Sequence, residues 1–496
     1  MPIVSYPVAL RLSAERQPDA LALVCGGERL DYAGLERRSN RLARAYAERG
    51  VAEGDFVAIA LPNGAEFALA CFAVWKLGAI PQPLSWKLPE RERRAILELS
   101  KPALVVGVPE GDAAGFASVT PGFEPGADCD ESPLPDRISP SRQALASGGS
   151  TGRPKLIVDA LPAECDPSEP FYGNTPGNTV LVPGPLYHAA GFVNTTVTLL
   201  LGGCAVLLPR FDPAAALAAI ERHGVRWVSF VPTMLLRIWR LPAEERERYD
   251  LSSLERVVSS GAPCPGWLLR EWIGWIGADR VFEAYGGTER IGGTLISGRE
   301  WLEHPGSVGR PTGGRQLRIL DEAGREQPPG EIGEVFMMPP GGRGSTYRYV
   351  GAEARATRDG WETLGDLGYL DEEGYLYLVD RRTDMIVTGG ANVYPAEVEA
   401  AVEAFSDVRC CAVIGLPDDD LGQRVHAIVE ADALDEEVLR AHLAQHLSRT
   451  KLPRSFERVD GPLRDEAGKL RRFQLREARA GGGVALTDPR TGGTSR

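Results

Sequence analysis

The loop at residues 147–155 reads SGGSTGRPK and combines glycines with groups that can donate hydrogen bonds. Glycines let the backbone turn so that its N–H groups point inward, and Ser150, Thr151 and Lys155 add hydroxyl and ammonium donors. Such a loop can hold a phosphate group. It is not a Walker A loop, because no Gly-Lys-Ser or Gly-Lys-Thr sequence ends it. Taken alone, it is also compatible with an ordinary surface turn.

Two further motifs carry side chains suited to the same chemistry. In YGGTE at 285–289, the Tyr285 ring can stack on a purine, Thr288 can bind a phosphate oxygen and Glu289 can hold a hard cation. A Gly-Gly turn with polar neighbours is common in loops, so this motif is weak on its own. In PLYHAAG at 185–191, His188 stands in an apolar setting, where a lone histidine is more often a packed core residue than a catalytic one.

The elements that must position these motifs alternate regularly from residue 179 onward. A helix is predicted at Pro213–His223, because Asp212 can cap its first turn and Gly224 follows its end. Alternating strands and helices predict a parallel sheet covered by helices, with ligands bound beyond the carboxyl ends of the strands. The predicted strands are Thr179–Val182, Ala205–Leu208, Trp227–Val231, Arg256–Ser259 and Val281–Ala284.

The flanking segments complete an α/β fold with a large N-terminal domain of parallel βα subdomains, a small β-rich subdomain and a small α+β C-terminal domain. Residues 108–140, rich in Pro, Gly, Asp and Ser, are predicted to be surface connection, and residues 309–371 the β-rich subdomain. Further helices are predicted at 33–50, 66–77, 395–405 and 436–447, and further strands at 57–61, 408–414 and 425–429.

A charged crossing at 380–384, which reads DRRTD, separates two apolar strand patterns and is predicted to be a hinge. A chain of 496 residues is not expected to fold around a single core. The predicted domains are residues 1–382 and residues 383–479. The Gly-rich tail at 480–496 is expected to be disordered.

Bulk composition excludes several classes of protein. A net charge of −13 argues against nucleic acid as a partner. No apolar run reaches the length of a membrane span, and the first residues lack the pattern of a signal peptide. The eight cysteines form no CxxC pair, which favours reduced thiols over disulfides or a zinc site and predicts a cytoplasmic location.

Taken together and in order, the motifs resemble those of the adenylate-forming superfamily, which comprises acyl-CoA synthetases, nonribosomal-peptide adenylation domains and luciferases. SGGSTGRPK is followed by PLYHAAG, by SSGAP at 259–263 and by YGGTE. WETLGDLGYLDEEGYLYLVDRRTD, GGANVYPAEVE and DEAGKLRR follow. The resemblance extends over nearly the whole chain, and the acyl-CoA synthetase branch is favoured.

This resemblance implies a role for each matching position. Ser147, Ser150, Thr151 and Lys155 would handle the ATP phosphates, with Thr288 at the α-phosphate and Glu289 holding Mg²⁺. Gly261, Ala262, Pro263 and Tyr285 would form the adenine slot, and Asp366 and Arg381 would bind the ribose hydroxyls. Lys469 would reach the substrate carboxylate and the α-phosphate, and His188 would lie beside the carboxylate end of the acyl pocket. Gly389 and Gly390 would flank the entry of the pantetheine arm of coenzyme A.

The implied reaction has two steps. The substrate carboxylate attacks the α-phosphorus of ATP and expels pyrophosphate, and the acyl adenylate is then open to a thiol, most simply that of coenzyme A. Both anions must be brought together, so positive charge at Mg²⁺, Lys469 and the loop is required. Between the steps the C-terminal domain of such enzymes rotates about the hinge.

Four positions, in three motifs, depart from the family pattern. Thr383 stands at the hinge position where Asp or Lys is usual, so the pivot is either Thr383 or its neighbour Asp384. The phosphate loop has Gly148 where Ser is usual and Leu156 where Gly is usual. Ala391 replaces the glutamate of the commoner GGEN sequence.

The substrate is the least determined part of the prediction. No carrier-protein domain follows Lys469, and no Asp near His188 is placed to hold an amine. The phosphate-loop variant and the small residues Gly292 and Gly293 favour a bulky acid of polycyclic, terpenoid or steroid type. An aryl acid comes second and a medium-chain fatty acid third.

Two alternative functions stay open. The chain could be a stand-alone enzyme that loads a separate carrier protein, or a nucleotide-binding regulator without activity. A homodimer also stays open.

Overall fold

The computed structural model describes residues 2–148, 154–466 and 468–480. These residues form two compact units. The first comprises the residues up to Leu378 together with Glu466 and Gly468, and the second comprises Val379–Asp465 and the residues from Lys469 onward. The units divide after Leu378, whereas the predicted boundary lay after residue 382. The predicted disordered tail lies outside the described residues, apart from residue 480.

A nine-stranded sheet forms the centre of the first unit, in the order β17-β16-β15-β14-β13-β11-β12-β2-β3. All five predicted strands are present and pair in parallel with one another, as predicted, whereas β15 also pairs antiparallel with β16 at the edge of this group. They are β11 (Thr179–Val182), β12 (Cys204–Leu207), β13 (Trp227–Phe230), β14 (Arg256–Ser260) and β15 (Val281–Gly286). The outer strands are β2 (Leu21–Cys25), β3 (Glu28–Asp31), β16 (Gly293–Ser297) and β17 (Arg310–Pro311).

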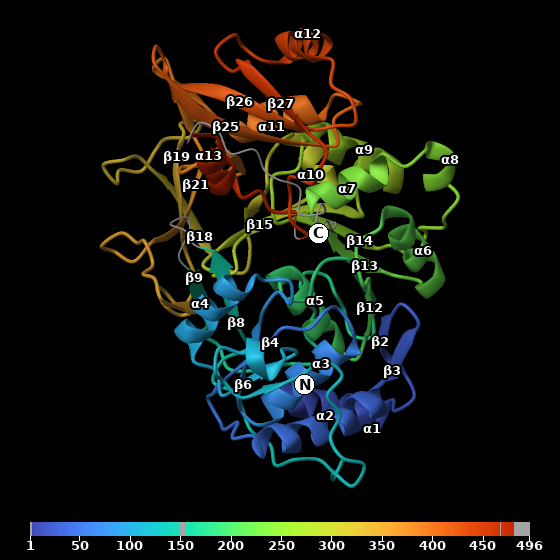
Figure 1. The fold of residues 1–496 in the computed structure, drawn as a ribbon. Coiled ribbons are helices and arrows are strands. Elements are labelled where there is room, and N and C mark those ends of the chain that lie inside the picture. The colour runs from blue at the N-terminus through green and yellow to red at the C-terminus, as the bar shows by residue number, and fades with distance from the viewer. Residues whose placement is uncertain (1, 149–153, 467, 481–496) are drawn as a thin grey trace, which may run out of the picture. The chain divides into compact units, whose positions relative to one another are not determined.

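Helices cover this sheet, and Figure 1 shows α6 and α7 beside β13 and β14. The helix α6 (Pro213–His223) has the predicted bounds, because the Asp212 carboxylate accepts the N–H of Ala215 at 2.8 Å and Gly224 ends it in the left-handed conformation. The other helices here are α5 (Ala189–Leu200), α7 (Pro232–Trp239), α8 (Ala243–Arg246), α9 (Gly266–Ile276) and α10 (Gly298–Glu303). Among the described residues, no helix has both the length and the apolar character to span a membrane.

A smaller parallel sheet, in the order β5-β4-β6-β7, forms the N-terminal part of the same unit. The helix α3 (Ala65–Lys76) is buried along nearly its whole length, as expected for a helix whose residues between Glu66 and Lys76 are all apolar. The other elements are α1 (Tyr6–Arg16), α2 (Tyr32–Ala47), α4 (Glu90–Ser100), β4 (Phe56–Ile59), β5 (Ile80–Pro83), β6 (Leu104–Val106) and β7 (Ser118–Val119). Residues 108–140 are mostly irregular, as predicted, apart from a short 3₁₀ turn at Glu110–Asp112 and the edge strand β7.

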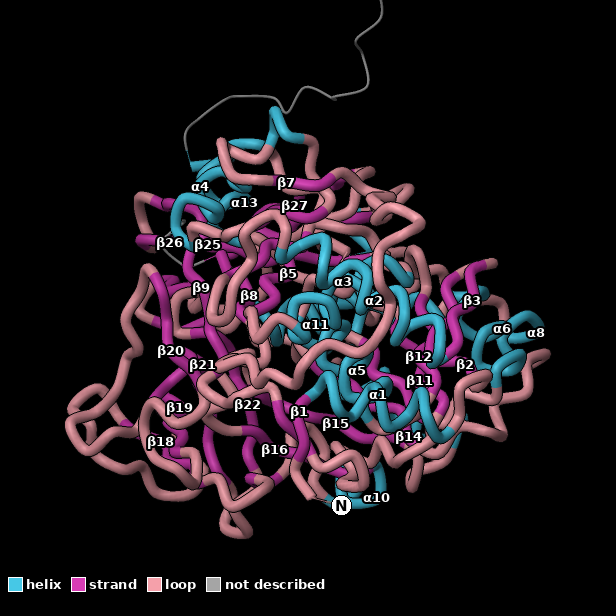
Figure 2. The backbone as a smooth tube through the Cα atoms, turned by 90° about the horizontal axis from the view of Figure 1, so that it is seen from below, coloured by secondary structure: helices cyan, strands magenta, loops and turns pink. Residues whose placement is uncertain are grey.

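Three antiparallel sheets complete this part of the chain, among the described residues. The four strands β18 (Gln316–Leu320), β19 (Gly333–Met338), β21 (Glu362–Leu370) and β22 (Leu376–Arg381) lie side by side in Figure 2 and form the predicted β-rich subdomain. A three-stranded sheet joins β8 (Ala144–Gly148), β9 (Pro154–Asp159) and β20 (Tyr347–Val350). A two-stranded pair, β1 (Val4–Ser5) with β10 (Glu164–Cys165), completes the unit.

The second unit packs helices against a five-stranded sheet, which confirms the predicted α+β domain. Its strands are β23 (Ile386–Thr388), β24 (Ala391–Val393), β25 (Cys410–Asp418), β26 (Gly422–Glu430) and β27 (Ser455–Val459). Its helices are α11 (Pro395–Glu403), α12 (Glu436–His446) and α13 (Arg472–Ala480). The core lies between α11, α12 and the sheet, and includes Val398, Val402, Val413 and Leu439.

A buried ion pair joins α2 to α3. Lys76 is 3% exposed, and its Nζ lies 2.6 Å from the Glu36 carboxylate and 2.6 Å from the Asn40 side-chain oxygen. Burial lowers the pKa of Lys76 to about 8, against the opposing effect of Glu36. Removing one partner of such a pair leaves the other charge buried and uncompensated.

Replacing Lys76 with Met is therefore expected to destabilise the fold by about 3–5 kcal/mol. The double variant K76M/E36L, which removes both charges, should recover most of that loss. Arg299→Met breaks an ion pair that is exposed on both sides, and should leave the unfolding midpoint nearly unchanged. Denaturant melts of the three variants check this, and equal destabilisation by K76M and K76M/E36L would contradict it.

Candidate active site

The strands β8 and β9 form a hairpin that positions the two ends of the predicted phosphate loop. Ser147 on β8 is paired in register with Lys155 on β9. Ser150 and Thr151 lie outside the described residues. Leu156, one of the departures from the family pattern, is fully buried and packs with Ala144 and Val158, so its side chain serves the core.

Lys155 lies close to Glu289, although 134 positions separate them in the sequence. The Lys155 Nζ is 3.6 Å from Glu289 Oε1 and 4.0 Å from the centre of the Tyr349 ring. The Tyr349 hydroxyl donates to the same Glu289 oxygen at 2.6 Å. Glu289 is only 8% exposed, so these two partners offset the cost of burying its charge.

Tyr349 is a site residue that sequence reasoning missed. It lies on β20, which pairs with β9, and this pairing brings it beside Lys155. Burial, and then the neighbouring Glu289 carboxylate, raise the pKa of Tyr349 well above its usual range, so the hydroxyl remains a donor. The alternation YRYV at 347–350 predicts a strand, but nothing in the sequence indicates which strand it joins.

Glu289 fits the role of a magnesium ligand. Among the described residues, no group of three or more His, Cys, Asp or Glu is arranged to hold a metal ion. Magnesium is commonly bound through one or two carboxylates together with substrate phosphates and water, so a single buried carboxylate is a suitable ligand. Thr288 precedes it in the same turn and is half-buried, and its predicted contact with a phosphate oxygen stays a prediction.

Among the predicted nucleoside residues, Tyr285 and the loop at 261–263 lie at the carboxyl ends of two neighbouring strands of the central sheet. Tyr285, near the end of β15, donates its hydroxyl to Asp366 on β21 at 2.7 Å. Gly261 follows the neighbouring strand β14 and has a φ of +85°, which a glycine adopts without strain. Ala262 and Pro263 continue this loop. Arg381 is exposed and lies in the other compact unit, so its predicted pairing with Asp366 stays a prediction.

His188 is not a packed core residue. It occupies the cap position before α5, is half-buried, and its ring centre lies 4.7 Å from that of Tyr187. This places it beyond the carboxyl end of β11, at the same edge of the sheet as Gly261 and Tyr285. The predicted role beside a substrate carboxylate stays a prediction.

The glycines that follow Glu289 are small for a reason other than the one predicted. A side-chain carbon at Gly292 would lie 2.3 Å from the sulfur of Met337, and one at Gly293 would lie 3.1 Å from the Tyr285 carbonyl oxygen. Ile291 between them and Glu289 is buried in the core. These glycines permit close packing and do not open a space, so they lend no support to a large acyl pocket.

The remaining predicted residues lie in the second unit. Gly389 and Gly390 both have positive φ and connect β23 to β24, which is the geometry of a two-residue hairpin turn. Lys469 is exposed, and its backbone N–H donates to the Asp465 carboxylate at 3.0 Å.

The two candidate hinge residues differ in how they are held. Thr383 is exposed in a turn, whereas Asp384 accepts a bond from Arg472 at 3.0 Å. Of the two candidate pivots, Thr383 is the less constrained.

A buried carboxyl group beneath the site also escaped sequence reasoning. Glu283 is 5% exposed on β15, two residues before Tyr285, and accepts a bond from the backbone N–H of Cys264. Burial raises the pKa of Glu283 to about 8 despite that bond. The loop after β14 is thus linked to β15 by a carboxyl group that is largely protonated at neutral pH.

Comparison with known proteins matches both units to parts of one enzyme family. Residues 10–342 match the family model described as AMP-binding enzyme, and residues 397–469 match the AMP-binding enzyme C-terminal domain. The chain is 35% identical to a feruloyl-CoA synthase of an Amycolatopsis species, over 95% of this chain and 98% of that protein. It is 30% identical to the fatty acid–[acyl-carrier-protein] ligase ScoC of Streptomyces coeruleorubidus, over 94% of each chain.

A solved structure shares the fold over nearly its full length. The o-succinylbenzoate coenzyme A synthetase of Bacillus subtilis, in complex with ATP and magnesium ion, superposes with a TM-score of 0.79 at 28% identity. The match covers 96% of this chain and 100% of that one.

The raised pKa of Glu283 predicts a pH-dependent effect on stability. An unfolded glutamate releases its proton near pH 4.3, about the usual value. The folded chain keeps it up to about pH 8, so between these values the native state binds more protons and this group lowers stability as pH rises. In Glu283→Gln this loss is absent. The melting temperature of the variant, relative to the native chain, should therefore rise from pH 5 to pH 8.

Glu244→Gln, which changes an exposed glutamate, is the control. The same pH trend in both variants would contradict the raised pKa of Glu283.

Proposed function

The chain belongs to the family of AMP-binding enzymes, and we propose that it joins a ring-containing carboxylic acid to coenzyme A in two steps driven by ATP. The family match and the relatives confirm the adenylate-forming class, the acyl-CoA synthetase branch and the ligase activity that the motifs predicted. They also confirm ATP, Mg²⁺ and coenzyme A as cofactors. The identity of the acid and of the acceptor are the parts proposed here.

In the first step, a carboxylate oxygen of the acid forms a bond to the α-phosphorus of ATP, and the bond to pyrophosphate breaks. Lys155 and Thr288 bind phosphate oxygens, while Tyr285 and Asp366 hold the nucleoside. Lys469 brings positive charge to the reacting oxygens. Mg²⁺ held by Glu289 would neutralise phosphate charge during this step. In the second step the thiolate sulfur attacks the acyl carbon, and AMP leaves.

The observation that carries this proposal is the triad Lys155–Glu289–Tyr349. A carboxylate suited to Mg²⁺ and a lysine suited to phosphate come from segments far apart in the sequence and from two different sheets, yet they lie 3.6 Å apart. If the two motifs were ordinary surface turns, we would not expect their side chains to be in contact. The pairing of Tyr285 with Asp366 supports the nucleoside part of the site in the same manner.

The proposed substrate is a ring-containing acid, with monocyclic aryl acids ahead of polycyclic ones. The feruloyl-CoA synthase that this chain resembles at 35% identity supports an aryl acid. A bulkier terpenoid or steroid-like acid stays a prediction based on the phosphate-loop variant, since the packing of Gly292 and Gly293 removes the other argument for it.

Coenzyme A is the proposed acceptor, because the feruloyl-CoA relative is the more similar of the two described above. The carrier-protein ligase among the relatives keeps transfer to a separate carrier as the second candidate. All eight cysteines are free thiols, which supports the predicted cytoplasmic location.

A pyrophosphate-release screen tests the proposal. The purified chain is given ATP, Mg²⁺ and acids of graded bulk, namely a benzoate, a hydroxycinnamate, a medium-chain fatty acid and a steroid-type acid. We expect acid-dependent release to be fastest with the hydroxycinnamate or the benzoate. A fatty acid as the best substrate would overturn the ring-containing assignment, and no acid-dependent release with any acid would restore the regulator without activity.

The acceptor is tested with the best acid from that screen. Coenzyme A and a phosphopantetheinylated carrier protein are offered in separate reactions, and thioester formation is measured by mass spectrometry. We expect the CoA thioester. A thioester found on the carrier alone would overturn the CoA-ligase assignment.

A further inference from the structure

Two arginines flank Lys469 in the second unit, Arg464 five residues before it and Arg472 three residues after it. Arg464 and Leu470 pair through their backbones, and the Asp465 N–H donates to the Lys469 carbonyl oxygen at 3.1 Å. Lys469 thus projects from a short hairpin, with its own side chain exposed. The two arginine side chains are 14% and 16% exposed, so both are largely buried.

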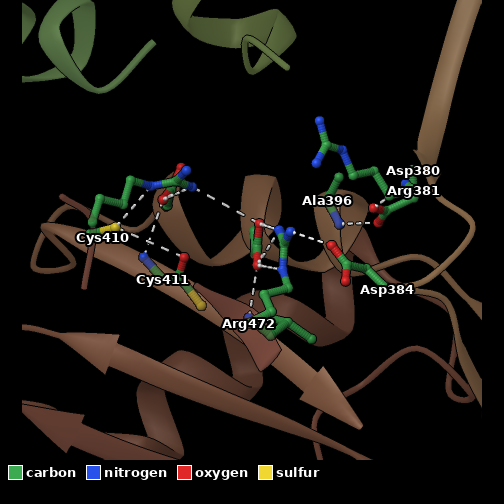
Figure 3. Close-up of polar contacts among 11 residues, drawn as sticks. Asp380, Arg381, Asp384, Ala396, Cys410, Cys411 and Arg472 are labelled. Carbon is green, nitrogen blue, oxygen red and sulfur yellow. Dashed lines mark hydrogen bonds and ion pairs between the residues drawn. The ribbon is translucent and has the colours of Figure 1, made fainter. Parts of the chain in front are cut away.

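Arg472, the first residue of α13, binds two acidic residues at once. It donates to both oxygens of Glu399, at 2.9 Å and 2.7 Å from Nη2, and from Nη1 to Asp384 at 3.0 Å. Figure 3 shows the Arg472 guanidinium and its bond to the Asp384 carboxylate. A cation at the start of a helix is unfavourable to the helix dipole, so this arginine is placed there for its partners and not for the helix.

Arg464, on the other side of the hairpin, binds α11, the helix that carries Glu399. It lies 3.6 Å from the Glu403 carboxylate and 4.0 Å from that of Glu399, and it donates to the Cys410 sulfur at 3.3 Å. Glu399 and Glu403 are four residues apart on α11 and therefore share one face. They also accept backbone N–H groups of β25, from Val413 at 2.8 Å and from Cys411 at 3.1 Å.

The start of α11 is tied to the segment that precedes it. The Asp380 carboxylate accepts the N–H of Ala396 at 2.8 Å and that of Arg381 at 2.6 Å, as Figure 3 shows. Burial raises the pKa of Asp380 to about 6, even with these bonds and with Arg472 nearby. Asp384, four residues later, is held by Arg472. The hinge segment, α11 and the lysine hairpin are therefore joined by one buried network.

We propose that Arg472 and Arg464 are positioning residues for Lys469, which hold its hairpin against α11 through Glu399 and Glu403. This rests on the proposed function, in which Lys469 acts in adenylate formation and is withdrawn before thioester formation. A lysine on a short hairpin needs a rigid base, because a displacement of about 1 Å at a reacting group can cost on the order of 10² in rate. The network supplies that base within the domain that carries the lysine.

Arg472→Lys is the variant that tests the role. Lysine keeps the positive charge but cannot bind Glu399 through two parallel bonds and Asp384 at the same time. We expect adenylate formation to slow by about 10- to 100-fold. Thioester formation from a supplied acyl adenylate should stay within about two-fold of the native rate, because Lys469 has no role in it. Lys469→Ala sets the loss to be expected when the lysine is absent.

Arg479→Lys is the matched control. Arg479 also lies on α13, is 13% exposed and binds both oxygens of Glu457 at 2.6 Å. Its partner Glu457 lies on β27 and not on α11, which carries Glu399 and Glu403. Both half-reactions should stay near native in this variant. Equal effects of R472K and R479K, or equal loss of both half-reactions in R472K, would overturn the positioning role.

Hydrogen exchange tests the positioning role independently of catalytic activity. If the native chain forms no acyl adenylate, the proposed function fails, and positioning is still judged on the backbone amides of Asp465 and Lys469. We expect both amides to exchange at least ten-fold faster in R472K than in the native chain, with no change in R479K. Unchanged exchange in R472K would overturn the anchoring itself.

Discussion

The site in the large unit depends on one nearly buried carboxylate and on the two side chains that bind it. Glu289 is 8% exposed, and the Lys155 ammonium and the Tyr349 hydroxyl make that burial tolerable. The three side chains come from β9, from β20 and from the turn after β15. The central sheet and the three-stranded sheet must both form before the site exists. The function is thus a property of the tertiary arrangement, even though each motif is local in sequence.

Much of this arrangement follows from patterns within single segments. Strands β11 to β15 end within two residues of their predicted ends, because apolar runs are bounded by Gly, Pro and polar residues. The bounds of α6 agree fully, since Asp212, Pro213 and Gly224 mark both of its ends. Tertiary neighbours have no such local pattern. Tyr349 reaches Glu289 because β20 pairs with β9, about 190 positions away, and the glycines at 292 and 293 are small because Met337 and the Tyr285 backbone lie against them.

The second unit uses buried charge differently. Isolated buried ion pairs often contribute little to stability, but they fix geometry when each partner is fully bonded. Glu399 is bound by Arg472, by Arg464 and by the backbone of β25, so its position is determined from three sides. The same helix begins beside Asp380. Apolar packing in the core holds the domain together, and this polar layer sets where the lysine hairpin lies relative to α11.

The central claim is that Glu289 makes ATP chemistry possible by holding magnesium. Acid-dependent ATP–pyrophosphate exchange, measured over a range of Mg²⁺ concentrations in the native chain and in Glu289→Gln, tests it most directly. The variant should need more Mg²⁺ and should lose on the order of 10²- to 10³-fold in maximal rate. Glu362→Gln is the control, because Glu362 is a buried glutamate that accepts a tyrosine hydroxyl at 3.1 Å in the same unit, and it should keep the native Mg²⁺ dependence. A Glu289→Gln variant with native rate and native Mg²⁺ dependence would contradict the account.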